Sequence, residues 1–351
     1  MPELRVDVDA IGSNTEAVAA LLRSRGLALV AVTKACLGEP RVAAAMVAGG
    51  AVAVADTRDA NLRRLRSALP GVELHRIHLP SLVEPFEPGD VTYVSSREGA
   101  SAVAALGVPA APGGGTAGDL PAVKAGTTEG RRRVMIQVET GDEREGVPPD
   151  ALVDLAVEIA GDRRLRLEGV ATNYACFRGA PEHIRESVET VARATSMLRA
   201  AGLPVERVSG GNSSLLYLLT EGEDLPAEVT ELRCGEALLL GHDALYYRPL
   251  PGCRTEACVL RAEVVEEYTR PAAGGRAHRL VLGVGRQDLG SGAVRFEQAG
   301  LTEVGRSADY LVVEAEREYS NVPVGTMLDM IPAYEALVAA WTSPYVELKL
   351  L

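Results

Sequence analysis

Lys34 ends the apolar, β-branched run Leu27-Ala-Leu-Val-Ala-Val-Thr-Lys34. Such a run is typical of a fully buried strand, and an ammonium group at its end is costly to bury unless it has a partner or a chemical role. A lysine desolvated at the end of a strand is a plausible amine nucleophile for a Schiff base. The alternative is that Lys34 is the first residue of a solvated loop, and for this lysine taken alone that alternative is favoured.

Two later segments carry groups that bind anions. Ser209-Gly-Gly-Asn-Ser-Ser214 precedes an apolar run at 215–219. Glycines and hydroxyls that open a helix leave backbone N–H groups and the helix dipole directed at a phosphate, although an ordinary loop with a serine cap fits the same residues. Further on, Arg233 lies within an apolar run and needs a buried acceptor, while Gly235 lets the backbone approach a ligand closely.

A third segment, Glu139-Thr-Gly-Asp-Glu-Arg-Glu-Gly146, follows an apolar strand candidate at 134–138. Arg144 in this segment is a candidate partner for a carboxylate or a phenolate, and a charged surface turn is the alternative. The five histidines are scattered, and His75-x-x-His78 within a strand makes a poor metal site. We therefore expect no metal.

The segments that position these residues alternate between strand and helix patterns. Helical patterns cover 11–25, 40–48, 58–69, 149–160 and 183–201, and strand candidates cover 27–33, 51–55, 72–79, 91–94, 134–138, 165–172, 205–208 and 232–240. This alternation predicts a (β/α)8 barrel with its site at the carboxyl ends of the strands. An open doubly wound sheet is the rival, but no Gly-x-Gly-x-x-Gly follows the first strand.

The pattern changes near residue 245. Strand-like runs at 257–266, 279–282, 310–314 and 345–350 have turn-rich connections and little helix. They predict an all-β second domain over 246–351, after a barrel domain over 1–245. The alternating residues 4–10 are a candidate strand of that second domain. Residues 107–131 are rich in Gly, Ala, Pro and Thr, and we expect a long loop there.

The composition restricts the class of protein. A net charge of -12 argues against a nucleic-acid or anionic-membrane surface. The five cysteines are widely spaced and include no Cys-x-x-Cys pair, which suits reduced thiols in a cytoplasmic protein. No stretch approaches 18 uninterrupted apolar residues, so we expect no membrane span.

Several segments together resemble the ornithine/lysine branch of the alanine racemase family. They run in order along nearly the whole chain: Ala31-Val-Thr-Lys-Ala35, Gly141-Asp-Glu-Arg-Glu-Gly146, Thr172-Asn-Tyr-Ala-Cys176, Ser209-Gly-Gly-Asn-Ser-Ser214, Arg233-Cys-Gly-Glu-Ala-Leu-Leu-Leu-Gly241 and Thr342-Ser-Pro-Tyr-Val346. The resemblance implies a fold-type III pyridoxal 5′-phosphate enzyme, with a barrel and a C-terminal β domain. It also implies a head-to-tail homodimer with shared active sites.

The resemblance assigns roles position by position. Lys34 would hold the cofactor as a Schiff base and then act as a base on one face of the substrate Cα. Arg233 would lie against the pyridine nitrogen, where a permanent cation weakens the electron sink and limits transamination. Arg144 resembles the arginine near the cofactor phenolate or substrate carboxylate, and Asn173 stands where the family has a residue beside the ring. The phosphate contacts would be Ser213, Ser214, Gly235 and Tyr345.

The second base stays unassigned. Alanine racemases supply a tyrosine from the C-terminal domain, and no tyrosine here is clearly in register with it. The candidates are Tyr268, Cys176, Asp309 and Tyr310.

The substrate is expected to be a basic or polar amino acid, such as ornithine or lysine, because the resemblance is to that branch. Glu139, Asp142 and Glu143 are candidates for holding a side-chain ammonium. Two departures, Tyr310 in place of a histidine and Glu143 in place of an apolar residue, leave the substrate open. The alternatives are a decarboxylase or aldolase of the same fold, and a non-catalytic cofactor-binding protein.

Overall fold

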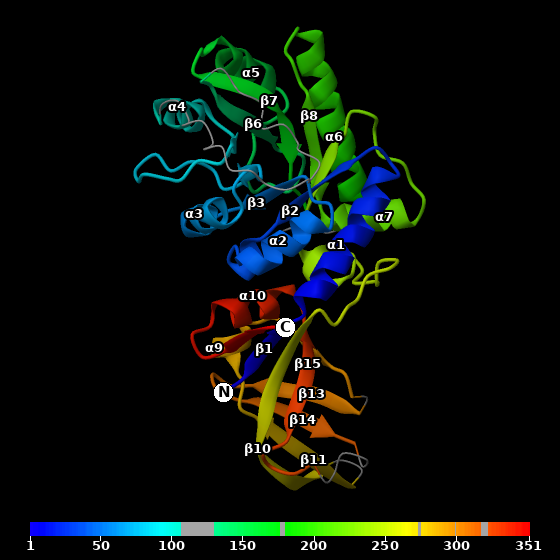
Figure 1. The fold of residues 1–351 in the computed structure, drawn as a ribbon. Helices are drawn as coiled ribbons and strands as arrows, with labels where there is room; N and C mark the ends of the chain where they lie inside the picture. The colour runs from blue at the N-terminus through cyan, green and yellow to red at the C-terminus, as the bar shows by residue number, and fades with distance from the viewer. Residues whose placement is uncertain (107–129, 176–179, 273–274, 299, 317–321) are drawn as a thin grey trace.

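The computed structural model describes residues 1–351 except 107–129, 176–179, 273–274, 299 and 317–321. It has two parts, a barrel and a sheet domain, which meet beside the helices α9 (Arg286–Leu289) and α10 (Tyr334–Thr342) (Figure 1). The long loop expected at 107–131 falls almost entirely outside the described residues.

Eight parallel strands close the barrel, so the predicted (β/α)8 barrel is confirmed. Closure brings the first and last strands together, with Ala31 opposite Cys234. The strands are β2 (Ala28–Val32), β3 (Ala53–Asp56), β4 (Leu74–Arg76), β5 (Val91–Val94), β6 (Arg132–Val138), β7 (Leu165–Thr172), β8 (Arg207–Asn212) and β9 (Glu231–Cys234).

Helices surround the barrel, and local signals set where several of them begin. Asp7 caps the first helix by accepting a hydrogen bond from the Ala10 N–H at 2.8 Å. Pro40 and Pro181 occupy the first turns of their helices, where a missing N–H costs little. The helices are α1 (Val8–Arg23), α2 (Pro40–Ala48), α3 (Asp59–Ala68), α4 (Arg97–Ala105), α5 (Leu152–Gly161), α6 (Pro181–Ala200), α7 (Leu216–Thr220) and α8 (Glu236–Leu240), with the 3-10 turns η1 (Lys34–Cys36) and η2 (Ser213–Leu215).

The prediction of a strand over 232–240 is wrong after residue 234. The strand stops at Cys234, and 236–240 is the helix α8. Ala237 to Leu240 are buried on all sides, so the segment has no polar stripe to reveal a helical period.

The second domain is an antiparallel sheet in the order β12-β15-β10-β11-β14-β13. Its strands are β10 (Cys258–Ala272), β11 (Gly275–Leu282), β12 (Val294–Phe296), β13 (Leu301–Arg306), β14 (Leu311–Ala315) and β15 (Met327–Pro332). The expectation of an all-β domain is corrected by α9 and α10. Helix α10 carries the buried Trp341 and packs on η1 of the barrel.

The N-terminal strand belongs to this sheet. β1 (Glu3–Val6) pairs antiparallel with β10 and parallel with β16 (Glu347–Leu350). The strand pattern seen at 4–10 therefore ends at Val6, and α1 begins two residues later. No helix within the described residues is long and apolar enough to cross a membrane.

Candidate active site

Lys34 stands at the carboxyl end of β2, as the first residue of η1. Thr33 fixes this end of the strand, because its buried hydroxyl donates to Asp56 Oδ2 at 2.7 Å on the neighbouring β3. Ala35 and Cys36 are buried, whereas Lys34 itself is exposed in the single chain. The desolvation expected of this lysine is therefore not present in one chain alone.

Arg233, near the end of β9, is held inside the barrel and is only 5% exposed. Its Nη1 donates to Ser209 Oγ and its Nη2 to the Thr172 carbonyl, both at 2.6 Å. The guanidinium carbon lies 5.2 Å from the ring centroid of Tyr93. No carboxylate pairs with Arg233 within the described part of the chain, so its partners are neutral and its charge is not cancelled.

The segment after β8 places several hydrogen-bonding groups at the carboxyl end of the barrel. Asn212 accepts the Ser214 N–H at 2.9 Å and donates to Asn173 Oδ1 at 3.0 Å. The Ser213 hydroxyl oxygen accepts two long hydrogen bonds, from the N–H of Gly235 at 3.4 Å and of Ala237 at 3.3 Å. The start of η2 thus meets the start of α8.

Gly235 joins β9 to α8 where no side chain fits. A Cβ there would lie 2.7 Å from the carbonyl oxygen of Val32 on β2. The backbone N–H groups after Arg233 are therefore drawn close to the strand that ends in Lys34.

Arg144 lies in a tight acidic turn after β6. It forms an ion pair with Glu145 and its Nε lies 3.8 Å from Asp142 Oδ2. Glu139 accepts the N–H of Glu143 at 3.2 Å, and Glu143 has a φ of 52°. The guanidinium of Arg144 thus already lies close to two carboxylates, those of Glu145 and Asp142, in the single chain.

Other predicted site residues lie on the sheet domain. Asp309 and Tyr310 are in an exposed turn between β13 and β14, where Asp309 accepts from Gln287 Nε2 of α9 at 3.0 Å. Tyr268 is on β10. Tyr345 is 56% exposed, and its side chain makes no hydrogen bond within the described residues. Cys176 lies outside the described residues.

The sequence reasoning missed three polar residues at this end of the barrel. Glu236 is half-buried at the start of α8, and burial, with the nearby carboxylates of Glu335 and Asp243, raises its pKa to about 8 against an opposing effect of Lys34. Gln137 on β6 is 4% exposed. Tyr334 begins α10, the helix that packs on η1. A glutamate and a glutamine inside apolar runs were the available signals.

These residues fit a pyridoxal 5′-phosphate. The ligand needs an amine, a cradle for its phosphate and polar groups around its ring. Lys34 supplies the amine, and the N–H groups that converge on the Ser213 hydroxyl supply phosphate donors. Arg233 supplies an uncancelled charge. The buried Nε2 of Gln137 has no acceptor within the described residues, which leaves a donor for a ligand.

Comparisons with known proteins agree with this geometry. Residues 6–243 match the family described as alanine racemase, N-terminal domain. A lysine racemase of Thermotoga maritima is 29% identical, covering 99% of this chain and 97% of that protein. An ornithine racemase of Acetoanaerobium sticklandii is 26% identical, covering 100% and 99%.

Solved structures show the same fold at low identity. An alanine racemase from Corynebacterium glutamicum is 18% identical with a TM-score of 0.70, covering 100% of this chain and 99% of that chain. A D-threonine aldolase from Filomicrobium marinum is 19% identical with a TM-score of 0.72, covering 97% and 89%. The family match spans more than half of the chain, so this protein belongs to the alanine racemase N-terminal domain family and is a pyridoxal-phosphate-dependent racemase.

Proposed function

We propose that this chain interconverts the L and D forms of a basic or polar α-amino acid, with the cofactor held by Lys34. The observation that carries the proposal is the meeting of three features at one end of the barrel. Lys34 follows the end of β2, the donors around Ser213 lie at the ends of β8 and β9, and Arg233, near the end of β9, has no carboxylate partner among the described residues.

Each residue of the site has a distinct role in the proposed racemisation. Pyridoxal 5′-phosphate, when bound, withdraws electrons from the substrate and makes its Cα–H acidic. Ser213, Ser214 and the N–H of Gly235 bind the phosphate. Arg233 keeps a fixed positive charge beside the ring nitrogen and disfavours its protonation, which limits side reactions. The amine of Lys34 takes a proton from one face of Cα and returns it.

Asn173 and Arg144 would border the ring and the substrate carboxylate. Asn173 is held in place by Asn212, whose Nδ2 donates to it. Tyr345 stays a candidate for contact with the phosphate, and Tyr334 is a second candidate because its helix packs on η1.

Racemisation needs a second base on the opposite face of Cα, and we propose Asp309 or Tyr310 of a second subunit, with Cys176 and Tyr268 as the remaining candidates. Lys34 is exposed at the barrel mouth, and the turn that carries Asp309 and Tyr310 is exposed on the sheet domain. A head-to-tail homodimer would bring the two exposed surfaces together and desolvate Lys34.

Mixing two inactive chains tests the shared site. Lys34→Ala and Asp309→Ala subunits should together restore up to one working site per heterodimer. If both variants are inactive alone and subunit exchange is verified, a mixture that recovers nothing excludes a site shared through Asp309.

The proposed substrate follows from the two relatives, a lysine racemase and an ornithine racemase. A side-chain ammonium needs a carboxylate or carbonyl partner. Glu139, Asp142 and Glu143 lie at the end of β6 and would supply it.

The decisive experiment is a screen of all common L-amino acids in D₂O, read by mass and by chiral chromatography. Deuterium uptake with inversion of lysine or ornithine supports the proposal. Uptake and inversion of alanine alone would overturn the basic substrate, and uptake without inversion would show that the second base is missing. Cleavage of β-hydroxy amino acids without inversion would favour an aldolase instead.

We also propose a domain boundary near residue 245 and a cytoplasmic location. The boundary falls between α8, which ends at Leu240, and β10, which begins at Cys258. Cys36, Cys234 and Cys258 are buried and free, which suits a reducing compartment.

A further inference from the structure

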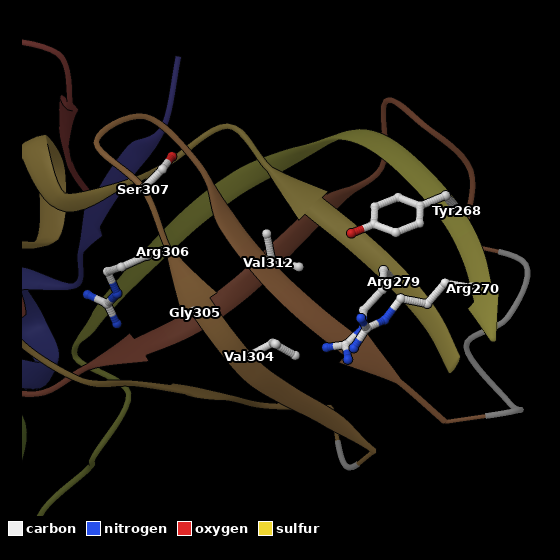
Figure 2. A pocket seen from close by; sticks show the side chains of 8 residues that line it. All are labelled: Tyr268, Arg270, Arg279, Val304, Gly305, Arg306, Ser307 and Val312. Atoms are coloured by element: carbon white, nitrogen blue, oxygen red, sulfur yellow. The ribbon is translucent and has the colours of Figure 1, made fainter. Parts of the chain in front are cut away.

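The sheet domain carries a groove of about 220 Å³ on the face of β10, β11, β13 and β14 (Figure 2). We call it the arginine groove. It is lined by Tyr268, Arg270, Arg279, Val304, Gly305, Arg306, Ser307 and Val312. None of these residues belongs to the cluster around Lys34.

Strand register places two of the arginines on one face of the sheet. Tyr268 lies opposite Arg279, and Arg270 lies opposite Ala277. Residues opposite each other in an antiparallel pair share a face, so Arg270 and Arg279 are diagonal neighbours within reach of each other. Figure 2 shows both guanidinium groups and the Tyr268 hydroxyl directed into the groove.

The positive charges in the groove are only partly balanced. Arg306 is paired with Glu303 at 2.6 Å. Arg279 is 5% exposed and its Nη2 contacts Glu314 at 2.7 Å, but its buried Nη1 has no acceptor within the described residues. Arg270 is exposed and makes no ion pair in the described part of the chain.

Such an arrangement is costly without an anion. A buried charged N–H that lacks an acceptor carries the full cost of its desolvation. Two like charges beside each other on a sheet add a repulsion. An oxyanion seated between Arg270 and Arg279 would supply the acceptor and remove the repulsion.

We propose that the arginine groove binds a small carboxylate carried on a short apolar chain. The carboxylate would lie between Arg270 and Arg279, near the Tyr268 hydroxyl. Val304, Val312 and the Tyr268 ring give the groove an apolar flank, which inorganic phosphate would not use. The proposed ligand is not the substrate of the proposed reaction, although Tyr268 is one of the candidates for the second base and Ser307, at the edge of the groove, lies two residues before Asp309.

Calorimetric titration of the cofactor-loaded protein with acetate, butyrate and inorganic phosphate tests the proposal. Butyrate should bind about 15-fold more tightly than acetate, because each of its two additional methylene groups contributes about fourfold when buried. Phosphate should bind more weakly than butyrate. Equal binding of phosphate and both carboxylates would overturn the proposed ligand class.

Variants separate this groove from the cofactor site. Arg279→Gln should abolish the butyrate signal, and Arg270→Gln, an exposed position with little risk of misfolding, should weaken it at least fivefold. Arg276→Gln is the matched control, because Arg276 is exposed on β11, the strand that carries Arg279, but on the opposite face of the sheet. The cofactor absorption should be unchanged by butyrate in every variant.

Two results would overturn the proposal. One is butyrate binding that is unaffected by both Arg270→Gln and Arg279→Gln, or that shifts the cofactor absorption. The other is a combination of two observations: the wild-type protein does not bind butyrate, and sedimentation shows that these variants no longer form the dimer. The groove would then hold a side chain of a second copy of the chain.

Discussion

The two ends of the barrel use the same kinds of charged residue in opposite ways. At the amino ends of the strands, Glu73 contacts Arg133 and Arg207 at 2.6 Å each, and His75 at 2.7 Å. Arg207 also contacts Glu231 at 2.7 Å. Because Arg207 starts β8 and Glu73 precedes β4, on the far side of the barrel, these contacts cross its interior.

At the carboxyl ends, charged and polar groups are left unbalanced. Arg233 has only neutral hydrogen-bond partners, Glu236 has a raised pKa, and Gln137 has a buried donor without an acceptor among the described residues. Buried charges that satisfy one another make the loss of a single partner costly, whereas unsatisfied groups at one end of the barrel mark the place where a ligand completes the structure. Substitutions at the two ends should therefore change different properties of the protein.

The largest effect is expected from Arg207→Met. It leaves Glu73 and Glu231 without one of their partners inside the barrel, and removing one partner of a buried pair costs about 3–5 kcal/mol. The free energy of unfolding, measured by denaturant titration, should fall by that amount. Arg193→Met is the control, because the Arg193–Glu189 pair is exposed on both sides and its loss should cost about 0–1 kcal/mol. Equal losses in the two variants would show that the interior network is not structural.

Arg233→Glu should lower the racemisation rate on the order of 100-fold, the size of effect seen when a preorganised charge at a reacting group is lost. Side transamination should rise, because a carboxylate at this position favours a proton on the ring nitrogen. Arg233→Lys keeps the positive charge, so its racemisation rate should fall less than that of Arg233→Glu. A wild-type racemisation rate in the Arg233→Glu protein would show that Arg233 does not contact the ring.

The ring of Tyr93 packs against the guanidinium of Arg233, so a substitution of Tyr93 should affect the cofactor site through that arginine. Tyr93→Leu removes a cation–π contact of about 0.5–2 kcal/mol and should weaken cofactor binding about 2- to 30-fold, measured by fluorescence titration. Tyr93→Phe keeps the ring and should bind the cofactor like the wild type. If Phe and Leu weaken binding equally, the contact that matters is that of the hydroxyl, 3.5 Å from His75 Nδ1.

The smallest effect is a pH dependence at Glu236. Its pKa of about 8 in the folded chain lies above the ordinary value of 4.5, so the folded state binds the proton more tightly. This contribution to stability is complete below pH 4.5 and is lost as the pH rises through 8. Glu236→Gln should therefore unfold on the order of 2 °C above the wild type at pH 9, with the difference vanishing at pH 4.5. The exposed Glu16→Gln should show no such trend, and a difference that grows toward low pH would contradict the sign.

The sequence predicted the barrel because its strands are short, buried and separated by amphipathic helices. It predicted the positions of Lys34, Arg233 and Ser213 because each follows or ends such a strand. It did not predict α8 or α10. The residues 236–240 are buried on all sides, and α10 is apolar at nearly every position between Glu335 and Thr342, so neither segment shows a polar stripe with a helical period.

The sequence alone also could not predict which charged residues pair with one another. Glu73, Arg133, Arg207 and Glu231 are far apart along the chain, and only closure of the barrel brings them together. The raised pKa of Glu236 likewise arises from burial and from Glu335, a residue of the other domain. Sequence patterns report which residues are polar, but pairing is a property of the fold.

Borohydride reduction of the cofactor-loaded protein, followed by peptide mapping, tests the central claim most directly. The chain has only three lysines, Lys34, Lys124 and Lys349, and Lys349 is already paired with Glu3 at 2.6 Å. The account predicts that the reduced cofactor is found on the peptide containing Lys34 and that Lys34→Ala abolishes the label. Label on Lys124 or Lys349 with none on Lys34 would contradict it.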